Sequence, residues 1–185
     1  MSLPEELERI VVEASAHART GETLAAVLTA EPHPGRRVYL CAFEEPEGGQ
    51  RGWLGLDGEG APVADRRTLR DAISIAALCE VAEESAGGGD LDDLRARLVT
   101  LRLTQELPGI EEAEEAALAL QHVLGTPPHV ASPARLDEIA AATRRLEQAL
   151  GESAGSPFAE ALKAATPVIE ELTRDVEAGY RFDLA

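Results

Sequence analysis

The chain has 185 residues, of which 44% are hydrophobic and 3% aromatic, and its formal net charge is −17 at pH 7. A surface this negative repels the phosphates of nucleic acids and of anionic lipids, so we expect neither a nucleic-acid partner nor a membrane partner. A chain of this length fits one domain, which we expect over residues 1–185. With so few aromatic side chains, the core should consist of Ala, Leu, Val and Ile, which suits packed helices.

The N-terminus and the two cysteines indicate a cytoplasmic protein. Residues 1–6 include two glutamates and lack the apolar stretch of a secretion signal. The most apolar run, Ala72–Leu78, is far shorter than the ~20 residues that a membrane-spanning helix needs. Cys41 and Cys79 form no CxxC motif, and we expect both to be buried free thiols.

Two helical segments are expected in the N-terminal region. Ser2 followed by Glu5 is typical of a helix start, in which each side chain caps a backbone N–H near the other residue. This first helix should end near His17. A second, shorter helix is expected over Glu22–Thr29, and Pro32 should end it because proline lacks the backbone N–H that a helix requires.

The next segment reads as a small antiparallel sheet over about residues 37–63. Val38–Phe43 is apolar at every position, which indicates a strand covered on both faces. A loop at Glu45–Gly49 should lead to a returning strand at Trp53–Leu56. Ala61–Val63 is expected to add a short edge strand, because a proline inside a strand is tolerated at a sheet edge.

The rest of the chain is expected to be helical. The first helix should cover about residues 66–86, and its segment Ala72–Cys79 has no polar face, which is typical of a central helix buried on all sides. Further helices should begin after Asp90, at Ile110, at Pro133 and at Pro157. Each carries Leu, Ile or Ala at alternating steps of three and four residues, which predicts one buried stripe per helix.

These elements together predict an α+β fold that is predominantly helical. A small antiparallel hairpin or meander, over about residues 37–63, should pack on a helical bundle around the buried helix at 66–86. Within the single domain, we expect helices over 1–35, the meander over 36–64 and the bundle over 65–185.

Gly151–Gly155 matches the Gly-x-Ser-x-Gly pattern of the serine nucleophile in α/β-hydrolases, with Ser153 at its centre. That motif needs a strand before the serine and a histidine after it. Here a helix is expected before the motif, and the last histidine is His129. We therefore expect a loop between helices and no catalytic role for Ser153.

One acidic segment resembles the all-α nucleotide pyrophosphohydrolases, in which carboxylates on neighbouring helices hold Mg²⁺ against a triphosphate. Glu111, Glu112 and Glu115 have the Glu-Glu-x-x-Glu spacing of that family, and carboxylates at this spacing share a helix face. The family's second pair, Glu-x-x-Asp, has no counterpart on the next helix. The alternative is structural, because glutamates in the first turn of a helix stabilise its dipole. The acids between residues 80 and 93 also have two interpretations. A hairpin of two helices could bring them together as a cation site, or they could be solvated loop residues.

The functional expectation is an assembly or regulatory protein without enzymatic activity and without a cofactor. An apolar stripe on the last helix, which Pro167 should kink, is wide enough to serve as the interface of a homodimer. The expected interface residues are Phe158, Leu162, Ala165, Ile169, Leu172 and Val176. The alternative is a Mg²⁺-dependent nucleotide hydrolase that uses Glu111, Glu112 and Glu115.

Overall fold

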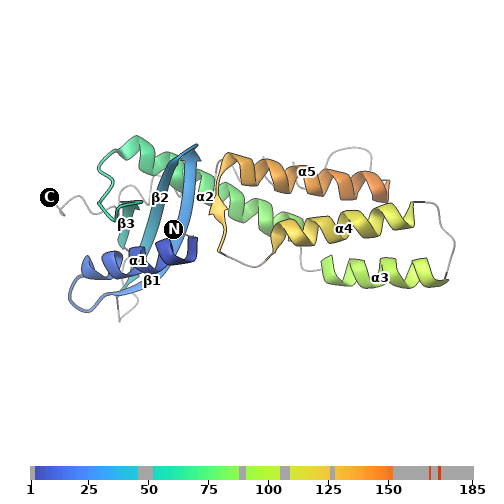
Figure 1. Cartoon of the computed structure of the whole chain (residues 1–185), viewed down its shortest axis with the longest axis horizontal. Coiled ribbons are helices and arrows are strands. Elements are labelled where there is room, and N and C mark those ends of the chain that lie inside the picture. The colour runs from blue at the N-terminus through green and yellow to red at the C-terminus, as the bar shows by residue number, and fades with distance from the viewer. Residues whose placement is uncertain are drawn as a thin grey trace. The chain divides into compact units, whose positions relative to one another are not determined.

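The computed structural model describes residues 3–45, 52–87, 91–104, 109–125 and 128–151, together with Pro167 and Glu171. The described part is an α+β fold that is mostly helical, as the sequence predicts (Figure 1). The chain forms two compact units. Unit 1 comprises Met1–Ala77, Pro128–Pro133 and Pro167–Ala185, and unit 2 comprises Leu78–Pro127 and Ala134–Thr166. The expectation of a single folding domain stays a prediction.

Unit 1 is built on a four-stranded sheet in the order β3-β2-β1-β4, which lies beside the first helix, α1 (Leu3–Ala16). β1 pairs with β2 and β2 with β3 in antiparallel register, whereas β1 and β4 run parallel. The strands are β1 (Thr23–His33), β2 (Arg36–Glu44), β3 (Gly52–Asp57) and β4 (Val130–Ala131). The predicted hairpin of β2 and β3 is thereby confirmed.

The helix expected at Glu22–Thr29 is wrong, because this segment belongs to β1. Its Leu and Ala residues favour a helix locally, but pairing with β2 and burial against the sheet core outweigh that preference. The connection to β2 is a two-residue turn formed by Pro34 and Gly35, with His33 paired to Arg36 on either side of it. Gly35 has a φ of 75°, which is the conformation that the third residue of a type II turn needs.

The core of unit 1 lies between α1 and one face of the sheet. Its buried members come from α1, β2 and β3, and Leu24 and Val27 of β1 pack against them. Alternate residues of β2 point to this face, and the residues between them are also buried, so β2 is covered on both sides as predicted. The fully buried residues of this cluster are Ile10, Ala14, Tyr39, Cys41, Phe43, Leu54 and Leu56.

The segment after β3 forms a bridge in place of the expected edge strand. Leu56 pairs with Pro62 at one isolated antiparallel position. Gly55 of β3 is needed for packing, because a Cβ atom at this position would overlap the side chain of Leu69. This close approach brings the start of the next helix against β3.

That helix, α2 (Arg66–Gly87), is less buried than its sequence predicts. Its buried residues are spaced three or four apart and form one stripe, whereas Ile73, Ala76 and Leu78 are half-buried, so the expectation of a helix buried all round is wrong. Residues 66–77 belong to unit 1 and residues 78–87 to unit 2, so the stripe serves two separate cores. The buried residues are Leu69, Ala72, Ile75, Cys79 and Ala82.

Unit 2 contains three further helices with starts and stripes close to those predicted. They are α3 (Leu91–Thr104), α4 (Ile110–Leu124) and α5 (Pro133–Leu150). Their shared core uses small side chains at close approach, and its buried members are Leu98, Ala113, Ala116, Ala117, Leu120 and Leu146. The expectation that everything after residue 65 is helical fails at β4, which adds two residues to the sheet of unit 1.

A charged contact connects three helices of unit 2. The guanidinium of Arg135, whose side chain is 10% exposed, lies 3.0 Å from the carboxylate of Glu83 and also donates a hydrogen bond to the Val123 carbonyl. Arg135 therefore links α5 to α2 and to the end of α4. Among the described helices, none is long and apolar enough to cross a membrane.

Candidate functional site

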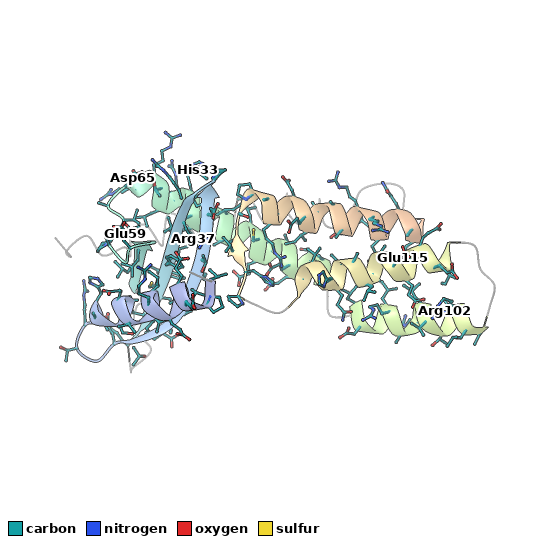
Figure 2. All side chains as sticks on the ribbon, viewed as in Figure 1. His33, Arg37, Glu59, Asp65, Arg102 and Glu115 are labelled. Atoms are coloured by element: carbon teal, nitrogen blue, oxygen red, sulfur yellow. The ribbon has the colours of Figure 1, made fainter. Side chains whose placement is uncertain are left out.

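One hollow among the described residues of unit 1 is an open groove of about 710 Å³. The turn between β1 and β2, the linker between β3 and α2, and residue Glu6 of α1 form its walls. Figure 2 labels Arg37, Glu59 and Asp65, which line this groove. Its charged residues are Glu6, Glu31, Arg36, Arg37, Asp57, Glu59 and Asp65.

Local hydrogen bonds explain how the chain forms the linker wall. The Asp57 carboxylate accepts hydrogen bonds from the backbone N–H groups of Glu59 and Ala61, each at 2.9 Å, which holds a tight turn. Gly60 adopts a φ of 87° in this turn. Arg9 of α1 donates a hydrogen bond to the Gly58 carbonyl and so attaches the turn to α1.

The start of α2 closes the same side of the groove. The Asp65 carboxylate accepts hydrogen bonds from the Thr68 hydroxyl at 2.5 Å and from the backbone N–H of Arg67 at 3.2 Å. The Thr68 hydrogen bond is the main reason that the pKa of Asp65 lies below its ordinary value, and the nearby Arg36 guanidinium lowers it further. Asp65 is therefore a charged carboxylate at neutral pH and caps the helix.

Arg37 lies at the centre of a charged network in the groove. Its Nη1 is 2.6 Å from a carboxylate oxygen of Glu6, and its Nε is 3.7 Å from Glu31. The adjacent Tyr39 hydroxyl, which has no hydrogen-bond partner of normal geometry among the described residues, is the main reason that the pKa of Arg37 is raised, and the two carboxylates raise it as well. The pKa of Tyr39 is raised to about 12, first by burial and then by the nearby Glu6 carboxylate. This network carries a net charge of −1, since two carboxylates share one guanidinium.

The other charges of the groove are less engaged with side chains of opposite sign. Among the described residues, Arg36 and Glu59 form no ion pair within 4 Å, and both are exposed. The carboxylates of Asp57 and Asp65 bond to backbone and hydroxyl donors and form no ion pair within 4 Å among the described residues, and Arg36 acts on Asp65 from a greater distance. With five carboxylates and two guanidiniums, the groove has a surplus of three negative charges. Such a site attracts a cation and can accept hydrogen bonds from it.

The acids of the predicted magnesium site lie in unit 2 and are exposed. Glu111, Glu112 and Glu115 lie on the first turns of α4, and Glu115 is 3.5 Å from Arg145 of α5. Within the described ranges, the structure shows no group of three His, Cys, Asp or Glu residues placed to hold a metal. Gln121 of α4 bonds to Asp92 of α3, so one acid of the 80–93 segment contacts α4 by a hydrogen bond of 2.7 Å. The magnesium hypothesis stays a prediction.

The predicted interface residues and Ser153 lie outside the described residues, whereas the two cysteines lie within them. The expected interface residues Phe158–Val176 and Ser153 lie outside the described residues; between 152 and 185 the structure describes Pro167 and Glu171, both helical and exposed. Cys41 and Cys79 are buried thiols outside any disulfide, as predicted. Burial raises the pKa of the Cys41 thiol to about 12, so the thiol stays protonated at neutral pH.

Sequence reasoning did not find the groove, although two signals for it are present. Pro34-Gly35 is typical of a tight turn and could have indicated a hairpin with a strand on each side. The Asp57–Gly60 turn was expected, but its position next to Arg36 and Arg37 depends on the sheet register. The groove residues, which are spread along the chain from Glu6 to Thr68, come together only after β1, β2 and β3 have paired.

Comparisons with known proteins add no relative: no family model matches this chain, and no curated protein or solved structure is significantly similar to it.

Proposed function

We propose that this protein is a non-enzymatic assembly or regulatory protein, and that its groove in unit 1 binds a basic segment of a partner protein. The observation that carries the proposal is the surplus of three negative charges around a groove of about 710 Å³. This volume is in the range of ligand sites, which is about 300–1,000 Å³. A lysine or arginine side chain suits it, because the charged groups of the linker wall are the carboxylates of Asp57, Glu59 and Asp65.

The charge of the whole chain supports a cationic partner. The net charge of −17 repels phosphates and attracts cations, and it increases the rate at which a basic segment meets the surface. At physiological salt this attraction acts over a screening length of about 8 Å. Binding therefore depends on the charges within the groove, and the other acids contribute to steering.

Two core groups of unit 1, Tyr39 and Cys41, stay protonated at neutral pH. The pKa values of Tyr39 and Cys41 are both raised to about 12, with burial as the main cause. A raised pKa keeps each group in its protonated form, which is the less reactive form for a nucleophile or a base. In the groove, the ion pairs with Glu6 and Glu31 hold the Arg37 side chain in place.

Self-association is the second part of the proposal. The apolar stripe from Phe158 to Val176 supports it through its sequence pattern, since six apolar positions recur at steps of three and four residues, a spacing that is typical of a continuous helix face. A dimer presents two grooves and so binds a partner with two basic segments more tightly than one groove does.

A peptide-binding experiment tests the groove. We expect a fluorescein-labelled peptide of alternating Arg and Gly to bind in fluorescence anisotropy, and a peptide of alternating Glu and Gly not to bind. Glu59→Gln should weaken binding about threefold to fivefold, since one exposed charge pair contributes about 1 kcal/mol. Arg36→Gln should strengthen binding by a similar factor, because it removes a repelling charge from the groove.

Glu112→Gln is the matched control, because Glu112 is an exposed glutamate of unit 2 and the change in net charge is the same. It should change the peptide affinity by less than about 1.5-fold at physiological salt. Equal effects of Glu59→Gln and Glu112→Gln would show that the peptide responds to net charge alone, and would contradict the groove as the site.

A further inference from the structure

One edge of β1 is covered by β4 only in part. β2 pairs with β1 along its length, whereas β4 pairs with it only at Thr29 and Ala30. On that side, no described strand pairs with the segment from Thr23 to Leu28. A strand edge presents backbone N–H and C=O groups that can pair with another strand.

The β1 edge, Thr23–Leu28, lacks most of the features that protect natural sheet edges. Edge strands are usually protected by charged side chains, prolines or bulges. From Thr23 to Ala30 the chain has neither a charged residue nor a proline. The side chain of Leu28 is 43% exposed although it lies in the sheet. The one protective feature is a bulge between Leu24 and Ala26.

This bulge also determines which side chains share a face of the sheet. Leu24 and Val27 both pack against the cluster under α1, so they lie on the same face. Thr23 pairs with Glu44, and Leu28 pairs with Leu40, on the opposite face. Without the extra residue, positions 24 and 27 would point to opposite faces, because side chains alternate along a strand.

We infer that the β1 edge pairs with the β1 edge of a second copy of this chain, in antiparallel register around a two-fold axis. In this register Leu24 lies opposite Val27 of the copy, and Thr23 lies opposite Leu28. Each pair then joins side chains on the same face, so both faces of the sheet continue into the partner. The inference rests on the proposed self-association and assigns it to a surface of unit 1.

The uncharged composition of the edge and the closure of a two-fold contact favour a second copy as the occupant. Two chains of charge −17 repel each other, so their contact must lie where the acids are absent, and the β1 edge is such a segment. A two-fold contact uses the same surface on both copies and leaves no further edge open at this place. The pairing also places Thr23 of the partner beside Leu28.

The test is sedimentation equilibrium of the full chain at about 50 µM in physiological salt. We expect the wild type to have twice the mass of one chain. Leu28→Lys should weaken the dimer at least tenfold and give monomers, because two lysines would enter the interface and edge lysines block strand addition. Leu118→Lys is the matched control and should stay dimeric, since Leu118 is a 52% exposed leucine on α4 of unit 2.

A charge pair tests the register. In the double variant Thr23→Glu/Leu28→Lys, each introduced carboxylate faces an introduced ammonium of the partner, so the dimer should recover. Circular dichroism of each variant confirms that the exposed substitutions leave the fold intact. A double variant that stays monomeric would contradict this register.

The remaining outcomes separate this inference from the rest of the proposed function. A monomeric wild type would overturn the edge contact and self-association together, while peptide binding to the groove would be unaffected. A dimer that resists Leu28→Lys but dissociates with Ile169→Glu would overturn the edge contact and assign self-association to the C-terminal stripe.

Discussion

The two units stabilise their cores in different ways. Unit 1 buries large side chains between a sheet and α1, including Tyr39 and Phe43, each with no exposed surface. Unit 2 buries small ones, and Ala113, Ala116 and Ala117 of α4 lie within its core. Small side chains allow helices to approach closely, whereas a sheet and a helix leave more space to fill.

The charged groups of the two units also differ in what surrounds them. In unit 1 they surround an open groove, and several are left without a partner of opposite sign. In unit 2 the ion pairs join neighbouring helices, as between Arg102 and Glu114 at 2.6 Å or between Arg135 and Glu83. The groove that we propose as a binding site therefore belongs to unit 1, whereas these ion pairs of unit 2 connect its helices.

The largest expected effect is the loss of a large side chain from unit 1. Phe43→Ala should lower the free energy of unfolding by about 3–5 kcal/mol, because it leaves a cavity between α1 and the sheet. Urea unfolding measures this change, and Trp53, the only tryptophan of the chain, reports on unit 1 by fluorescence. Val12→Ala, at a position 69% exposed on α1, should change stability by less than about 0.5 kcal/mol.

The same variant tests whether the units unfold together. If the chain is one domain, as its sequence predicts, Phe43→Ala should shift the fluorescence transition and the far-ultraviolet circular dichroism transition equally. Two transitions, of which only the fluorescence one moves, would show that unit 2 unfolds independently.

A smaller effect is expected for the charged contact of unit 2. Arg135→Ala should destabilise the protein by about 1.5–3 kcal/mol, since it removes hydrogen bonds to Glu83 and to the Val123 carbonyl at a largely buried position. Arg145→Ala, in the same helix, should cost less than about 1 kcal/mol, because its pair with Glu115 is mostly exposed. Equal losses would contradict the structural role assigned to Arg135.

The smallest expected effect depends on pH. The pKa of Cys41 is raised from 9.0 to about 12 in the folded chain, so the folded state holds its proton more tightly than the unfolded state does. This contribution to stability is complete below pH 9 and decreases as the pH rises from 9 toward 12. Between pH 8 and pH 10 it should cost about 1.4 kcal/mol.

Urea unfolding at the two pH values measures this loss, and Cys41→Ala is the comparison. The variant should lose less stability than the wild type over the same interval, and the remaining loss includes the start of the Tyr39 titration. An identical loss in both proteins would show that Cys41 does not contribute.

Local signals in the sequence predicted many of the elements. Pro133 after a serine marked the start of α5, and Asp90 preceded the start of α3. The apolar stripes of α4 and α5 predicted their buried faces, including Ala117 and Ile139. These predictions succeed because helix starts and stripes depend on neighbours within a few residues.

The sequence alone therefore determined the α+β class, the β2–β3 hairpin, the later helices and the burial of both thiols, all of which follow from local periodicity and hydrophobicity. Only the tertiary structure decided that β1 is a strand, since its Leu and Ala residues suit either state and the choice depends on pairing with β2. It also decided that α2 serves two cores with one stripe. The groove also depends on the tertiary structure, because its charged residues come from segments far apart in the chain and meet only when the strands pair.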